Sequence, residues 1–278
     1  MAVMVVTDSS SRLLPDELQR WGIRQVPLHV LVDGADLLDG VDEVPHDVHD
    51  DAHATTAGAT PAALTETYRK ALADSGGDGV VAVHLSAALS STFSSAVAAS
   101  REFSSAVRVV NSRSAAAGVG FVALAAARAA AARGDLDAVE ASARAAVTRG
   151  RAFIVVHRLD NLRRSGRIGT AASWLGTALS LKPLLCLDVD GRLVLSQRIR
   201  TTSKAHAALI DEVVGVVGER GAQIAVHHVD NHDAADEIGA ALTSRLPQVV
   251  SLSITDMGPV LSVHVGGGAV GVCVTVDD

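Results

Sequence analysis

The amino-acid sequence predicts an α/β protein of two domains, the first Rossmann-like with a mainly parallel sheet and the second with a mixed or antiparallel sheet. A length of 278 residues suggests two domains or one large α/β unit. In the first half, short apolar runs alternate with Ala-rich helical patterns, which is typical of crossover units. In the second half, Asp190-Gly191 separates two apolar runs, which indicates a hairpin. We therefore expect domains of residues 1–152 and 153–278.

The first domain is expected to alternate strands with helices. Strands are predicted where β-branched residues are dense, and helices where Ala-rich patterns follow. The expected order is strand 3–8, helix 15–21, strand 24–32, polar helix 42–53, helix 61–73, strand 80–85, a helix from 91, strand 107–111 and helix 115–132.

The second domain follows a helix over 135–150, whose acidic first turn suits a helix N-terminus. Its elements are again short apolar strands and longer amphipathic helices. The expected order is strand 151–159, a hairpin within 182–198, helix 203–221, strand 223–229, helix 234–246 and strand 249–255.

Composition excludes several classes of protein. A net charge of -7 without a basic face argues against a nucleic-acid partner. No basic leader precedes the first strand, and no apolar stretch approaches the roughly 20 residues that span a bilayer, so we expect a soluble, cytoplasmic protein. Cys186 and Cys273 lie far apart in apolar stretches and indicate core residues of a reduced compartment.

Hydroxyl side chains are concentrated directly after the apolar run that ends at residue 83. The stretch "HLSAALSSTFSS", residues 84–95, has six Ser or Thr among its twelve residues. Hydroxyls between a strand and a helix either cap the helix or hold an anion beside its N-terminal amides. Both uses stay open for these hydroxyls at this point.

Two enzymatic interpretations fit this region less well. A serine hydrolase would use His84 near Ser86, but no G-x-S-x-G motif is present and several consecutive hydroxyls single out no nucleophile. A dinucleotide fingerprint would use Gly118, Gly120 and Ala123, but these fall inside a predicted helix. Close helix packing explains those glycines better, and no cofactor is expected.

Two histidine-rich stretches raise the question of a metal. The first contains His46, His49, Asp50 and His53, and the second is "VHHVDNHD" with His227, His228, Asp230 and His232. Zinc requires such ligands to converge, whereas His and Asp spaced along a polar helix usually form a solvated face. We therefore expect no metal site.

Basic and glycine-rich stretches complete the candidate chemistry. Arg163, Arg164 and Arg167 surround Ser165-Gly166, and Arg198, Arg200 and Lys204 follow a predicted strand. Guanidinium groups suit phosphates or carboxylates, although solvated basic loops are the simpler interpretation. "HVGGGAVG" lacks the Lys-Ser/Thr of a P-loop. The histidine of this stretch, His264, is interpreted either as a hydrogen-bond donor at a binding site or as a buried histidine bonded to a carbonyl.

Six stretches, taken together, resemble the DegV family of bacterial fatty acid-binding proteins. They occur in the family's order, and the resemblance extends over essentially the whole chain: "VVTDSSSRLLPDEL", "TTAGATPAAL", "LSAALSSTFSSA", "RRSGRIGTAASWLGTALSLKPLL", "RIRTTSKA" and "GPVLSVHVGGGAVGV". The sequence departs from the family pattern at a few positions, with Ala-Gly-Ala at 57–59, Ser91 for Gly, Phe93 for Tyr and Gly267 for Pro.

The resemblance implies that the chain buries a long-chain fatty acid in a lipid pocket at the domain interface. Its implied carboxylate ligands are the residues at the matching positions: Thr56, Ser90, Ser91 and His264. Ser90 is then expected to begin the helix, with its hydroxyl serving helix and ligand in turn. Arg167 and Arg200 would contact a partner, a separate ATP-dependent fatty acid kinase, or the phosphate that it adds. In this interpretation the chain is a non-catalytic carrier and a monomer, with transient membrane contact permitted.

Two other functions stay open at this point. One is a stand-alone esterase or phosphatase that uses the same Ser/Thr cluster. The other is a lipid-sensing regulator that binds a fatty acid without any kinase, and the sequence does not separate it from a carrier because the partner is encoded elsewhere.

Overall fold

The computed structural model describes residues 2–168 and 181–277. The chain folds into two compact units, each built from segments that are discontinuous in sequence. The first unit comprises Met1–Leu31, Asp36–Glu43 and Thr56–Thr148, and the second comprises Val32–Ala35, Val44–Thr55 and Arg149–Asp278. The expected domains of residues 1–152 and 153–278 are continuous, and they therefore differ from these units where the chain passes from one unit to the other. Residues 169–180 of the basic block quoted above lie outside the described residues.

The first unit contains a four-stranded parallel sheet with the order β2-β1-β6-β7. Its strands are β1 (Met4–Asp8), β2 (Arg24–Val26), β6 (Val80–His84) and β7 (Val107–Asn111). All five residues of β6 are buried, which explains why this strand reads as a continuous apolar run. The predicted parallel sheet is therefore confirmed.

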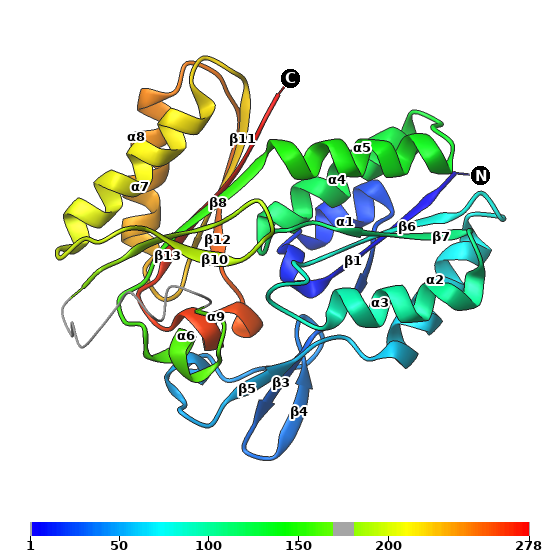
Figure 1. Cartoon of the computed structure of the whole chain (residues 1–278), viewed down its shortest axis with the longest axis horizontal. Coiled ribbons are helices and arrows are strands. Elements are labelled where there is room, and N and C mark those ends of the chain that lie inside the picture. Colours follow the sequence, from blue (N-terminus) through cyan, green and yellow to red (C-terminus); the bar gives the residue numbers. More distant parts are fainter. Residues whose placement is uncertain (1, 169–180, 278) are drawn as a thin grey trace. The chain divides into compact units, whose positions relative to one another are not determined.

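Helices cover both faces of this sheet (Figure 1). On one face α2 packs against α3, and on the other α1 packs against α4. The bounds are α1 (Pro15–Trp21), α2 (Pro61–Asp74), α3 (Thr92–Ser100), α4 (Ala117–Ala131) and α5 (Leu136–Arg149), with short 3-10 turns η1 (Ser9–Ser11) and η3 (Arg101–Phe103). Gly120 lies inside α4, where an added Cβ would meet the carbonyl oxygen of Ser11 at 2.7 Å, so close packing accounts for this glycine.

The second unit contains a six-stranded mixed sheet with the order β10-β9-β8-β13-β11-β12. Among the neighbouring pairs of these described strands, β11 and β12 run parallel and the others antiparallel. The strands are β8 (Gly150–Val155), β9 (Leu184–Leu187), β10 (Leu193–Gln197), β11 (Ala222–His228), β12 (Val249–Asp256) and β13 (Val270–Val276). The predicted hairpin is confirmed, since β9 and β10 pair antiparallel across a turn in which Gly191 has a φ of +77°.

Helices α7 (Thr202–Val217) and α8 (His232–Arg245) pack on this sheet and on each other. Their buried positions, such as Leu209, Val213, Ile238 and Leu242, recur at helical spacing and form the core of the unit. Two short helices, α6 (Asp160–Arg164) and α9 (Pro259–Val265), contact one another, and α9 also contacts the turn η2 (Val48–Asp50).

Two local predictions in the first half are wrong. The run 24–32 is not one strand: β2 ends before Pro27, and β3 (His29–Val32) belongs to a separate sheet with the order β4-β3-β5. Proline lacks the N–H that a continuous strand would need, and the Leu28 amide instead bonds to Ser9 Oγ at 3.0 Å. The polar helix expected at 42–53 is reduced to η2, and Pro45 inside the expected range lacks the N–H that a helix interior needs.

The remaining strands of this small sheet are β4 (Ala35–Leu38) and β5 (Thr55–Ala57). Among the helices of residues 2–168 and 181–277, none has both the length and the hydrophobicity that crossing a bilayer requires.

Candidate functional site

The polar groups of the first unit gather where the order of its parallel sheet reverses. The chain runs from β1 outward to β2 in one direction and to β6 in the other, so β1 and β6 are adjacent. In open α/β sheets, ligands bind beyond the carboxyl ends of the strands at such a switch point. Those ends carry Asp8 and Ser9–Ser11 after β1, and His84 to Ser86 after β6.

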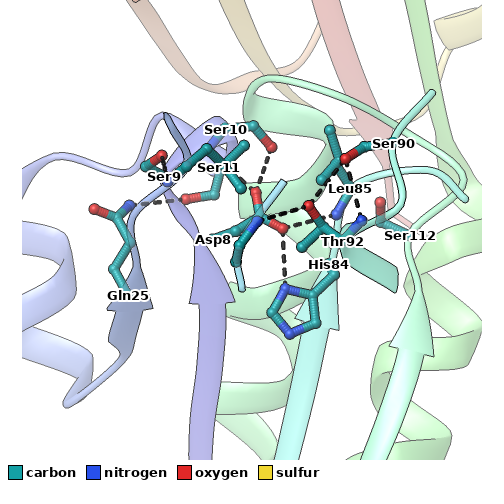
Figure 2. A network of polar contacts seen from close by, with 12 residues as sticks. Asp8, Ser9, Ser10, Ser11, Gln25, His84, Leu85, Ser90, Thr92 and Ser112 are labelled. Atoms are coloured by element: carbon teal, nitrogen blue, oxygen red, sulfur yellow. Dashed lines mark hydrogen bonds and ion pairs between the residues drawn. The ribbon is translucent and has the colours of Figure 1, made fainter. Parts of the chain in front are cut away.

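Asp8 is the centre of a buried network at this point (Figure 2). One carboxylate oxygen accepts from the Ser10 amide at 3.2 Å and the Ser10 hydroxyl at 2.5 Å. The other accepts from His84 Nδ1 and from the Leu85 amide, each at 3.0 Å. A carboxylate with no exposure to water needs such donors, and the two from His84 and Leu85 join the ends of β1 and β6.

The network continues from His84 to Tyr68, the only tyrosine of the chain. The Tyr68 hydroxyl lies 2.8 Å from His84 Nε2, and both side chains are completely buried. Burial, with a contribution from the Asp8 charge, raises the pKa of Tyr68 well above its usual range. A protonated Tyr68 can donate to Nε2 of a neutral His84 that itself donates from Nδ1 to Asp8.

This arrangement bears on the hydrolase interpretation. Both ring nitrogens of His84 are engaged, one by Asp8 and one by Tyr68. A histidine that activates a serine must reach the hydroxyl with one of these nitrogens. In the part of the chain that the structure describes, His84 therefore has no nitrogen left to serve Ser86 as a base.

Two of the three serines after β1 have structural roles. The Ser9 hydroxyl accepts from the Leu28 amide at 3.0 Å, and the Ser11 hydroxyl accepts from Gln25 Nε2 at 3.3 Å (Figure 2). Both serines are buried. These bonds hold β2 and the segment after it against η1.

Ser90 and Thr92 face one another at the start of α3, and their hydroxyl oxygens lie 2.9 Å apart (Figure 2). Ser90 Oγ also accepts from the Thr92 amide at 3.2 Å, and Thr92 Oγ1 accepts from the Ala59 amide at 3.3 Å. Between them and the chain at Gly58 there is little space, since an added Cβ would lie 2.6 Å from Thr92 Oγ1 and 3.2 Å from Ser90 Oγ. The segment that follows Thr56 is thereby held against both hydroxyls.

The start of α3 differs in detail from the expectation. The helix begins at Thr92, and Ser91 occupies the N-cap position without a capping bond from its side chain. Ser90 lies one residue earlier and bonds to the amide two residues on, which is a serine turn before the helix. Ser91 is exposed, whereas Ser90 and Thr56 are half-buried.

Three further predicted residues belong to the second unit. His264 lies on α9, and burial together with the charge of Arg167 lowers its pKa to about 4, so its imidazole is neutral at pH 7. Arg167 is exposed after α6 and contacts the Ser165 carbonyl at 2.5 Å. Arg200 is exposed between β10 and α7. The structure thus brings His264 and Arg167 near each other.

The histidine-rich stretches meet in the second unit. His46 Nε2 lies 3.2 Å and His49 Nε2 3.4 Å from the two carboxylate oxygens of Asp230. No group of three His, Cys, Asp or Glu residues suited to a metal ion occurs among the described residues. These contacts, with Asn161 Nδ2 donating to the His49 carbonyl at 2.8 Å, hold the η2 segment in place.

Several residues of the site were missed by sequence reasoning. Asp8 and Tyr68 were not singled out, His84 was considered only as a catalytic base, and Thr92 only as one of the six hydroxyls of residues 84–95. One signal was present: Asp8 and His84 both end strongly apolar strands, and the carboxyl ends of parallel strands meet at one edge. Neither Tyr68 nor Gly58 carries any comparable local signal.

The sequence matches known proteins along nearly its whole length. A family described as "Uncharacterised protein, DegV family" matches residues 2–277. The DegV domain-containing protein Rv2417c of Mycobacterium tuberculosis is 62% identical over 276 residues, which cover 99% of this chain and 98% of the relative.

Solved structures of other proteins also match this chain over its whole length. A DegV family protein from Thermus thermophilus, described for its fatty acid binding, has a TM-score of 0.93 and 30% identity, with 100% of each chain covered. DegV of Bacillus subtilis, described as a fatty acid binding protein, has a TM-score of 0.87 and 26% identity, again with 100% of each chain covered. The predicted α/β fold, with one parallel and one mixed sheet, is thus confirmed.

Proposed function

Since this chain belongs to the DegV family, we propose that it binds a long-chain fatty acid and holds its carboxylate with hydroxyls at the start of α3. The observation that carries the proposal is the pair Ser90 and Thr92, aligned by the Ala59 amide beside the switch point of the parallel sheet. Fatty acid binding is described for the Thermus and Bacillus relatives. Thr56, Ser90 and Ser91 are the proposed carboxylate ligands, and His264 is a further proposed contact.

The physical chemistry suits an acid of this kind. Neutral hydroxyls and the first amides of a helix stabilise an anion without a buried cation. An acyl tail adds about 0.8 kcal/mol per buried CH2, so a long chain contributes on the order of 10 kcal/mol before ordering costs. The tail therefore supplies affinity, and the hydroxyls supply orientation.

We propose further that the chain is a carrier that presents the acid to a separate ATP-dependent kinase. The kinase would transfer the γ-phosphoryl group of ATP to the carboxylate and release ADP. Arg167 and Arg200 are exposed, and a guanidinium can bind a phosphate in a bidentate manner. These two residues are the proposed contacts to the kinase or to the acyl phosphate.

A stand-alone esterase or phosphatase is the second candidate class. It is disfavoured because both nitrogens of His84 are already engaged within the buried network. A lipid-sensing regulator shares the binding site and differs only in having no kinase.

Mass spectrometry of an organic extract of the purified protein tests the binding proposal. We expect about one equivalent of a long-chain fatty acid, and no turnover of acyl or phosphoryl esters by the protein alone. An extract without lipid, together with no binding of a fluorescent fatty acid, would contradict binding. Ester turnover that is lost in Ser90→Ala would favour the enzyme instead.

Arg200→Ala tests the carrier proposal. With a fatty acid kinase catalytic subunit and ATP, we expect the loaded wild-type protein to support ADP release, and the variant to keep its fatty acid but lose most of this support. Arg192→Ala is a matched control, because Arg192 is an exposed arginine in the turn between β9 and β10. Equal loss of fatty acid from Arg200→Ala would instead assign Arg200 to the lipid site.

A further inference from the structure

Among the described residues, the Thr92 hydroxyl has one acceptor for its proton. Thr92 is completely buried, and its Oγ1 already accepts from the Ala59 amide at 3.3 Å. Within the described residues, the only other polar atom within hydrogen-bond distance is Ser90 Oγ, at 2.9 Å. A buried hydroxyl proton without an acceptor is unfavourable, so Thr92 is the donor and Ser90 the acceptor of this bond.

Counting donors and acceptors also defines the role of the Ser90 hydroxyl. A hydroxyl has one proton and can accept at two lone pairs. Ser90 Oγ accepts from the Thr92 hydroxyl at 2.9 Å and from the Thr92 amide at 3.2 Å, which fills both. Its own proton remains, and because Ser90 is half-buried this proton can reach a group outside the chain.

We infer that Thr92 is a positioning residue that turns Ser90 into a pure donor and thereby selects a head group that only accepts, an ionised carboxylate. The inference rests on the proposed fatty acid binding and deepens it. The bonds run in one direction, from the Ala59 amide to Thr92, from Thr92 to Ser90 and from Ser90 to the ligand, and successive bonds of this kind strengthen one another. A fatty alcohol carries no charge and gains less from the same donor.

These successive hydrogen bonds require a glycine at position 58. The Ala59 amide reaches Thr92 only because residue 58 has no side chain: a Cβ would lie 2.6 Å from Thr92 Oγ1 and 3.1 Å from the Thr92 amide nitrogen. The close approach therefore couples the backbone at 58–59 to the direction of the Ser90 proton.

Thr92→Val and Thr92→Ser test the inference. Valine matches threonine in shape and keeps the amide but removes the hydroxyl, whereas serine keeps both. The measurements are the Kd values of hexadecanoic acid and of hexadecanol, obtained by displacement of a fluorescent fatty acid. We expect Thr92→Val to weaken acid binding roughly ten-fold and alcohol binding less than two-fold, and Thr92→Ser to retain the wild-type preference for the acid.

Thr67→Val is the matched control, because Thr67 also donates its hydroxyl inside the first unit, to the Ala63 carbonyl at 2.9 Å. It should leave the acid-to-alcohol ratio unchanged. Equal loss of acid and alcohol binding in Thr92→Val would overturn the inference and leave Thr92 a structural role. Absence of acid binding by the wild-type protein would overturn the proposed function itself.

Gly58→Ala provides a second variant if Thr92→Val does not fold. It keeps the Thr92 hydroxyl but displaces it, and we expect the same ten-fold loss of preference for the acid. A wild-type preference in a folded Gly58→Ala protein would contradict the role of the close approach.

Discussion

Asp8→Ala is expected to lower the free energy of unfolding by about 3–5 kcal/mol. The substitution removes a buried carboxylate and leaves His84 Nδ1, the Leu85 amide and the Ser10 amide without their acceptor. Each buried donor that loses its partner costs about 1–3 kcal/mol. Urea denaturation followed by circular dichroism measures the change.

Two further substitutions test whether the loss of stability in Asp8→Ala comes from the buried network. Asp36 is exposed and pairs with His29 at 2.7 Å, so Asp36→Ala should cost less than about 1 kcal/mol. Tyr68→Phe removes only the hydroxyl that bonds to His84. We expect this substitution to lower the free energy of unfolding by about 1–2 kcal/mol. An Asp8→Ala protein as stable as the wild type would show that the carboxylate contributes nothing to the fold.

The double substitution Thr56→Val with Ser90→Ala is expected to weaken fatty acid binding by about 3 kcal/mol, roughly a hundred-fold in Kd. The reason is the loss of two hydrogen bonds to a charged group. Thr56 lies two residues before Gly58, which packs against Ser90, so both hydroxyls belong to one local structure. Titration with a fluorescent fatty acid measures the affinity.

Ser94→Ala with Thr65→Val is the matched control for this pair. Ser94 is exposed in α3 and bonds to the Ser91 carbonyl, and Thr65 bonds to Glu102 on an exposed surface. Their loss should leave the affinity unchanged. Wild-type affinity in the Thr56/Ser90 variant, with an unchanged unfolding transition, would remove these two residues from the head-group site.

Local patterns predicted most of the secondary structure because they depend on neighbouring residues. The helix expected at 61–73 is found as Pro61–Asp74, and the hairpin around Asp190-Gly191 is present. The prediction failed where a single residue outweighs a pattern, as at Pro27, where one missing N–H separates two strands into different sheets.

The site was predicted only in part, for a related reason. The hydroxyls of 84–95 were recognised as a group because they follow a buried strand. Which of them donates, and to what, depends on Ala59 and Gly58, more than thirty residues away in the sequence. Thr92 looked like an ordinary helix residue until its hydroxyl was seen against the Ala59 amide.

The fold class, the family and the stretch that carries the hydroxyls could all be predicted from the sequence, because periodicity and motif order are properties of the chain. The buried network of Asp8, His84 and Tyr68, and the bond between Thr92 and Ser90, became visible only in the folded structure. The physical reason is that a hydrogen bond needs a donor and an acceptor about 3 Å apart, and folding brings together groups that the sequence keeps apart.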